Sequence, residues 1–91
     1  MKSSAAVARI SQKLDSEGRL EKLGKVIASA RHQADGPTAI TQERLANATG
    51  IDRAHMSRLE RGKSNVTILN VLRVADALGV PASELLKRAG L

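Results

Sequence analysis

The sequence predicts an all-α fold of five helices, and three kinds of observation support this fold class. Apolar residues recur every three or four positions in successive segments, which is the spacing of one face of a helix. Threonine or aspartate stands before several of these segments, where a side-chain oxygen caps the first turn. Glycine stands after them, where helices commonly end with positive φ. The length of 91 residues allows one small domain.

The N-terminal part of the chain divides into an extension, residues 1–18, and the beginning of a domain that we place at residues 19–91. Apolar residues at helical spacing allow a short amphipathic helix over residues 4–14, and a frayed terminus is the alternative. The first helix of the domain is expected at residues 19–33. It contains Gly24, which costs about 1 kcal/mol relative to alanine in a helix but permits close packing.

Two short helices joined at a glycine are predicted between residues 41 and 62. Thr41 is the expected N-cap of the first helix and Asp52 that of the second, with Gly50 between them. Apolar residues of both helices are expected to form one inner seam, because they recur at helical spacing. The seam consists of Leu45, Ile51, Met56 and Leu59.

The second helix of this pair, over about residues 52–61, has a basic outer face. Three arginines and no carboxylate lie on the side opposite Met56 and Leu59. A helix with its guanidinium groups sorted in this way suits a polyanion. The net charge of +6 and the isoelectric point near 10.6 favour the same class of partner, through counterion release.

Two further helices are predicted after the pair. Thr67 caps the fourth helix, Gly79 ends it, and a last short helix is expected from about Pro81 to Leu86. The expected inner face of the fourth helix contains Ile68, Val71, Leu72, Ala75 and Leu78.

Composition and missing motifs exclude several classes of function. The chain has no cysteine, so disulfides and thiolate zinc sites are impossible, and it has no aromatic residue on which single-stranded bases could stack. The two histidines lie far apart, and there is no phosphate-cradling glycine loop or paired carboxylate set. We therefore expect no enzyme, no metal and no cofactor. No apolar run approaches the roughly 18 residues of a membrane span, and no signal peptide is visible, which favours a cytoplasmic protein.

One set of positions matches a known family. The set is Gln42, Leu45, Ala46, Gly50, Met56, Leu59, Glu60 and Gly62, followed by LRVADALGV at residues 72–80. With this spacing, residues 20–86 resemble the XRE/Cro/C1-type helix-turn-helix family of phage and bacterial repressors. The segment GIDRAHMSRLERGKSNVTI is similar, more narrowly, to the controller proteins of restriction–modification systems, which share an Asp-Arg start to the recognition helix and a later Asn-x-Thr.

The resemblance implies a lambda-repressor-like DNA-binding domain and a transcriptional regulator specific for a sequence in double-stranded DNA. Such a regulator acts as a homodimer on a palindromic operator, with its recognition helix in the major groove. It is expected to be autoregulatory, and activation would require contact with RNA polymerase. The alternative is an antitoxin, because many antitoxins carry the same domain; residues 1–18 would then neutralise the toxin.

The outer face of the recognition helix is the expected base-reading surface. The resemblance places a base-reading arginine at Arg53, which can bond both acceptors of a guanine, and a phosphate contact is the alternative. Ala54 offers a methyl group, and Ser57 follows along the exposed face. Arg58 reaches either bases or phosphate.

Phosphate contacts are expected at the beginning of the first helix of the pair and after the recognition helix. The family places the amide of Gln42 on a phosphate, towards which the helix also directs free backbone amides. His55 either bonds a phosphate or packs at the domain surface, and Lys63 either bonds a phosphate or stays solvated. The full expected set is Thr41, Gln42, His55, Arg61, Lys63, Ser64 and Asn65.

One ion pair within the domain and one dimer surface also follow from the resemblance. Arg31 and Glu60 are expected to form an ion pair that fixes the first helix against the recognition helix, the alternative being that both are solvated. The dimer surface is expected near the last helices, and its candidate residues either form a two-fold contact or only complete the core. These candidates are Val80, Leu85, Leu86 and Leu91.

Overall fold

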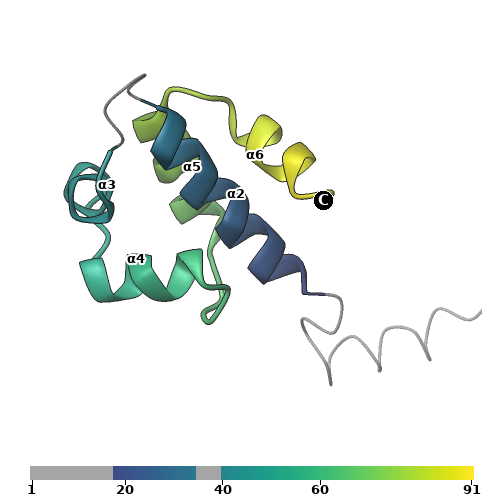
Figure 1. Ribbon diagram of the computed structural model, residues 1–91, viewed down its shortest axis with the longest axis horizontal. Helices are drawn as coiled ribbons and strands as arrows, with labels where there is room; N and C mark the ends of the chain where they lie inside the picture. Colours follow the sequence, from purple (N-terminus) through teal and green to yellow (C-terminus); the bar gives the residue numbers. More distant parts are fainter. Residues whose placement is uncertain (1–17, 35–39) are drawn as a thin grey trace, which may run out of the picture.

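The computed structural model describes residues 18–34 and 40–91, and within these ranges the chain forms five α-helices and no strand (Figure 1). The predicted all-α class is therefore confirmed for this part of the chain. The extension before Gly18, with its expected helix and its proposed role in an antitoxin, lies outside the described residues. The helices are α2 (Arg19–Gln33), α3 (Gln42–Thr49), α4 (Arg53–Glu60), α5 (Ile68–Leu78) and α6 (Ala82–Arg88).

Helix α2 runs through the middle of the domain, with α3 and α4 on one side of it and α6 on the other (Figure 1). It packs against α4, α5 and α6, while α5 also packs against α3 and α6. A single apolar core results, and its largest fully buried side chains come from all five helices. The four residues of the predicted seam between α3 and α4 are buried in this core, which confirms that prediction. The fully buried side chains are Ile27, Leu45, Met56, Val74 and Leu85.

Side-chain caps begin α3, α4 and α5. The hydroxyl of Thr41 accepts the backbone N–H of Arg44 at 3.0 Å, and that of Thr67 accepts the N–H of Asn70 at 3.1 Å. The Asp52 carboxylate accepts two backbone N–H groups of α4, at 3.0 and 3.3 Å. All three predicted caps are confirmed. Between α3 and α4 the chain turns at Gly50, whose φ of 75° is a conformation that other residues rarely adopt.

Helices α2 and α4 approach so closely that only glycine fits at the crossing. A Cβ on Gly24 would lie 2.4 Å from the backbone oxygen of Glu60 and 2.6 Å from that of Leu59. The helix-propensity cost of Gly24 is thus offset by direct packing of the α2 backbone on the end of α4. This crossing therefore holds the end of α4 against α2.

The predicted inner face of α5 is partly wrong. Ile68 and Leu72 are 66% and 45% exposed, whereas Val74, which was not assigned to that face, is fully buried. At 100° per residue, the buried stripe is rotated by roughly 45° from the predicted one. The rotation places Val74 in the core that α5 forms with α2, α3 and α6 and leaves Ile68 and Leu72 facing solvent.

The candidate dimer residues near the C-terminus also need correction. Leu85 is fully buried in the core, so it completes the domain and is not available to a partner. Val80 and Leu86 are half-buried and pack against the same core. Only Leu91 of the four candidates is mostly exposed. The reason is that α6 runs to Arg88, past the predicted end, and packs on both α2 and α5.

Candidate nucleic-acid interface

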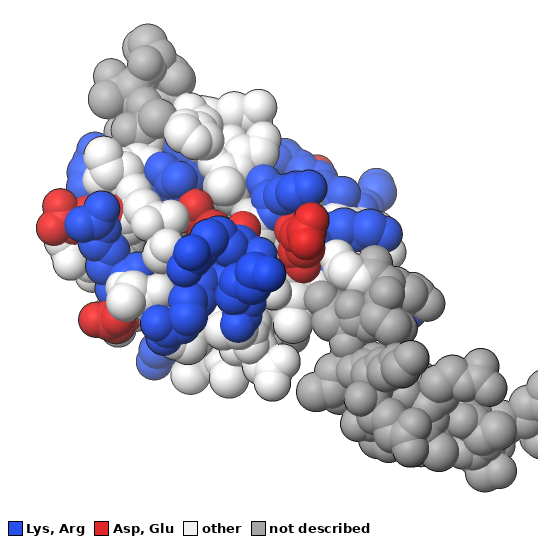
Figure 2. Space-filling model, turned by 60° about the horizontal axis from the view of Figure 1, so that its bottom comes forward, with Lys and Arg blue, Asp and Glu red and all other residues white. Residues whose placement is uncertain are grey.

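The outer face of α4 is basic and open to solvent. Met56 and Leu59 hold its inner side in the core, so the helix turns Arg53, Arg58 and Arg61 outwards, and all three are exposed. Viewed from the side of α4, lysine and arginine side chains gather over the middle of the molecule (Figure 2). The local sequence thus produces a continuous cationic surface on one side of the domain.

The two carboxylates at the ends of α4 are both engaged in the fold. Asp52 caps α4 by accepting two backbone N–H groups from the first turn of that helix. Glu60, the last residue of α4, forms a bidentate pair with Arg31 of α2, with Nε to Oε2 at 2.8 Å and Nη2 to Oε1 at 3.0 Å. The structure therefore contains the expected ion pair, and its side chains are only 11% and 6% exposed. The charge of Glu60 is therefore balanced by Arg31, and the Asp52 carboxylate is held at the beginning of α4.

The Arg31–Glu60 pair belongs to a larger buried network. Arg31 also donates from Nη1 to the backbone oxygen of Ile40 at 2.9 Å, just before α3 begins. Gln42, the first residue of α3, donates from Nε2 to Oε1 of Glu60 at 3.0 Å. One carboxylate therefore ties α2, α3 and the end of α4 together. No local sequence pattern indicates this bond from Gln42, whose predicted role was a phosphate contact alone.

The four residues expected to read bases lie on one side of α4. Arg53, Ala54 and Arg58 are exposed, and Ser57 is half-buried between them along the helix. The backbone oxygen of Ser57 accepts a bond from Nε of Arg61 at 3.2 Å, which holds the Arg61 side chain along the helix. The fold thus gathers these groups along one side of α4.

The residues expected to bind phosphate divide into two groups. Thr41, Arg61, Lys63 and Asn65 are exposed, although the Thr41 hydroxyl is already engaged as a cap. By contrast, Nε2 of His55 and Oγ of Ser64 are covered by protein and have no hydrogen-bond partner. In this conformation those two atoms cannot reach a phosphate, so the alternative interpretation of His55, a side chain packed at the domain surface, describes it better.

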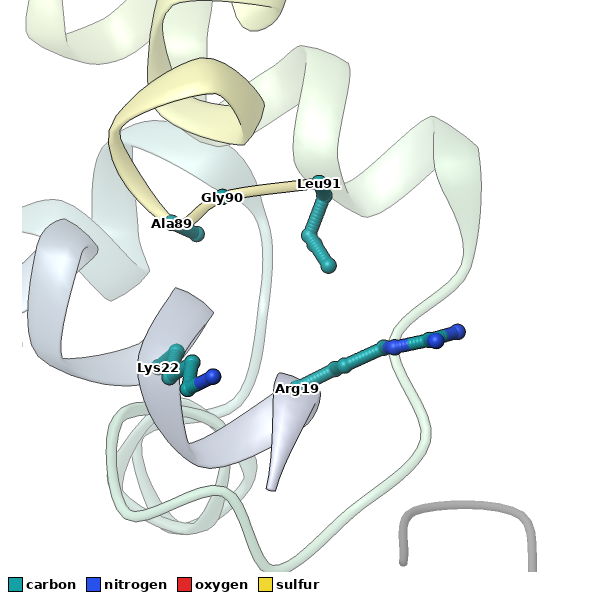
Figure 3. A pocket seen from close by; sticks show the side chains of 5 residues that line it. All are labelled: Arg19, Lys22, Ala89, Gly90 and Leu91. Carbon is teal, nitrogen blue, oxygen red and sulfur yellow. The ribbon is translucent and has the colours of Figure 1, made fainter. Parts of the chain in front are cut away.

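Two shallow hollows lie beside the beginning of α2. One, of about 370 Å³, lies where the chain leaves α4 and is lined by Leu20, Gly62, Lys63, Ser64 and Asn65. The other, of about 360 Å³, lies between the beginning of α2 and the end of α6, with Arg19 and Lys22 on one side and Leu91 on the other (Figure 3).

Within residues 18–34 and 40–91 there is no cluster of His, Cys, Asp or Glu that could hold a metal ion. No helix in these ranges has the length and apolar character that a membrane crossing requires.

A protein-family model matches the part of the chain that includes α4 and its basic face. Residues 39–85 match the helix-turn-helix family model HTH_3, which covers more than half of the chain, including α3, α4 and α5. The resemblance expected from the sequence is thereby confirmed.

Individual relatives agree with the family match. The chain is 44% identical over 46 residues to a hypothetical transcription factor of Neisseria meningitidis, a match that covers 50% of this chain and 43% of that protein. It is 38% identical over 48 residues to the control protein C.MunI of Mycoplasma sp, covering 53% of this chain and 65% of that protein. The chain thus spans about half the length of these relatives.

A solved structure resembles most of this chain. The crystal structure of the restriction–modification controller protein C.AhdI from Aeromonas hydrophila superimposes with a TM-score of 0.65 at 38% sequence identity. The superposition covers 72% of this chain and 94% of the controller protein. The likeness to controller proteins is therefore seen both in sequence and in fold.

Proposed function

Because the chain belongs to the XRE-type helix-turn-helix family, we propose that it is a transcriptional regulator that binds a palindromic operator as a homodimer and controls its own promoter. Helix α4 enters the major groove, and the residues that precede α3 and follow α4 hold the flanking phosphates. The observation that carries the proposal is the outer face of α4, on which the arginines are exposed while both nearby carboxylates are engaged in the fold.

The proposed division of labour follows the position of each side chain. Arg53 stands in the first turn of α4, the part of a recognition helix that meets base edges, and its planar guanidinium can bond O6 and N7 of guanine together. Arg58 lies further along the same face. Arg61, Lys63 and Asn65 lie where the helix ends and the chain leaves the groove, which suits contacts to the backbone.

Replacing Arg53 by alanine is expected to weaken specific binding by about 1–3 kcal/mol, because one bidentate base contact is lost. The measurement is a gel-shift titration at physiological salt with DNA from upstream of the protein's own gene and an excess of scrambled duplex. Arg88→Ala is the matched control, since Arg88 is an arginine on α6 that pairs with Glu84 at 3.0 Å, and it should bind like the parent. Equal binding of operator and scrambled duplex by the parent protein would contradict the proposal.

The surface proposed for the homodimer is the exposed face of α5. Ile68, Leu69 and Leu72 are large apolar side chains turned to solvent on one side of this helix. Arg73 and Asp76, both exposed, follow one turn after Leu69 and Leu72. In an isologous contact each residue meets the mate's complementary residue, so an arginine and an aspartate beside one apolar patch suit pairing with a second copy. This face of α5, and not the buried Leu85, is the surface that we propose for the homodimer.

Leu72→Glu is expected to dissociate the homodimer, because it places a charge in the middle of the proposed apolar contact. Leu91→Glu is the matched control, since Leu91 is 52% and Leu72 45% exposed, and it tests the contact expected at the C-terminus. Analytical ultracentrifugation gives the mass of each variant. A dimeric Leu72→Glu beside a monomeric Leu91→Glu would move the interface to the end of the chain, and a monomeric parent would exclude both surfaces.

A further inference from the structure

The side-chain amide of Gln42 is held in one orientation by Glu60. A carboxylate only accepts hydrogen bonds, so Gln42 must turn its NH₂ group, and not its oxygen, towards Glu60. The bond from Nε2 to Oε1 is 3.0 Å long. Glu60 cannot move to suit a different amide orientation, because its two oxygens are also bound by Nε and Nη2 of Arg31.

This orientation leaves one donor at the beginning of α3. An amide NH₂ group has two protons, and the bond to Glu60 uses one of them. Gln42 is half-buried and is the first helical residue after the cap, Thr41. The hydroxyl of Thr41 accepts the N–H of Arg44. The backbone N–H groups of Gln42 and Glu43 lie in the first turn, where a backbone amide has no acceptor inside the helix. A second proton of the amide at this point adds to the donors that a helix N-terminus offers to an anion.

We propose that Glu60 is a positioning residue for DNA binding: it fixes the polarity of the Gln42 amide so that its remaining N–H donates to a phosphate. The inference rests on the proposed function and explains how one residue serves both the fold and the contact. Without Glu60 the amide can rotate and turn its oxygen towards the phosphate, which that oxygen cannot bond. Because Glu60 is the last residue of α4, the same bond ties the phosphate contact of α3 to the helix that reads bases.

The test compares the parent, Gln42→Leu, Glu60→Leu and the double variant on a set of specific duplexes. Each duplex carries one uncharged methylphosphonate in place of a different phosphate. The parent is expected to lose roughly 10- to 150-fold in affinity at the phosphate that Gln42 contacts, as for one hydrogen bond to a charged group. Gln42→Leu and Glu60→Leu, which has no acceptor for the Gln42 amide, should each lose this sensitivity at that phosphate and keep it at the others. The double variant should behave like either single variant.

Gln33→Leu is the matched control, because Gln33 is exposed at the end of α2 and should keep the parent's pattern at every phosphate. A Glu60→Leu protein that retains the sensitivity which Gln42→Leu loses would overturn the role of Glu60. Unchanged sensitivity in Gln42→Leu would overturn the phosphate contact itself. A parent protein without specific binding would instead refute the proposed function, so the two failures are distinguishable.

A measurement on the free parent protein keeps the proposal testable where Glu60→Leu does not fold. In ¹⁵N-resolved NMR spectra, one side-chain amide proton of Gln42 is expected to exchange slowly with water, while both protons of exposed Gln33 exchange fast. On addition of the specific duplex, the second Gln42 proton should become protected as well. Fast exchange of both Gln42 protons in the free protein would contradict the fixed orientation.

Discussion

Glu60→Ala is expected to destabilise the domain by about 3–5 kcal/mol, because it leaves the Arg31 guanidinium buried without its carboxylate partner. The Arg31 side chain is only 11% exposed, so water cannot replace the two bonds that the substitution removes. The donor of Gln42 loses its acceptor at the same time. Small domains are stable by about 5–15 kcal/mol, so the loss is a large fraction of the whole. Urea unfolding followed by circular dichroism measures it.

The double variant Arg31→Met/Glu60→Leu separates the pair's contribution from the cost of an orphaned charge. Buried ion pairs replaced by apolar residues of similar volume are often neutral or stabilising, so the double variant is expected to be more stable than Glu60→Ala alone. A loss of less than about 1 kcal/mol for Glu60→Ala would match an exposed ion pair and contradict the burial of this one. Either result measures how much the Arg31–Glu60 pair contributes to the free energy of unfolding.

The helix boundaries could be predicted because their signals are local. Thr41, Asp52 and Thr67 cap through amides two or three residues ahead, and such bonds depend on little outside the helix itself. Gly50 likewise ends α3 through its own backbone conformation. The order of the five helices followed from these positions and from apolar spacing, whereas α6 extends to Arg88, past its predicted end.

The orientation of α5 could not be predicted with the same accuracy. Its sequence is rich in apolar residues, so more than one stripe has helical spacing, and the spacing alone does not choose between them. The choice is made by α2, α3 and α6, which bury Val74 and leave Ile68 and Leu72 outside. The same limit applies to Leu85, whose burial depends on how α6 packs on α2 and α5.

The candidate site divides in the same way. The arginine face of α4 follows from helix geometry once Met56 and Leu59 are assigned to the core. The bond between Gln42 and Glu60 joins residues 18 positions apart, and no local pattern marks it. The covered atoms of His55 and Ser64 depend on side-chain packing, which residue type alone does not specify. Sequence therefore locates the surface, whereas the structure decides which of its atoms can reach DNA.

Gly24→Ala is expected to destabilise the domain by about 1–3 kcal/mol or more, because the added Cβ would lie 2.4 Å from the backbone oxygen of Glu60. The neighbouring atoms belong to the backbone of α4, so a side-chain rotation cannot relieve the overlap. The helix must move away from α2, and the Arg31–Glu60 pair must lengthen with it. Urea unfolding gives the stability change, and specific DNA binding should weaken in the folded fraction.

Helix propensity and the clash with α4 change the stability of Gly24→Ala in opposite directions. Alanine is favoured over glycine in a helix by about 1 kcal/mol, so propensity alone would make Gly24→Ala stabilising. Ser29→Ala, at an exposed position of the same helix, is the control in which propensity acts without a clash, and it should be neutral or slightly stabilising. A stabilised Gly24→Ala would mean that α2 and α4 are not in backbone contact. A destabilised one would show that the crossing, and with it the position of the arginine face, depends on the absence of a single side chain.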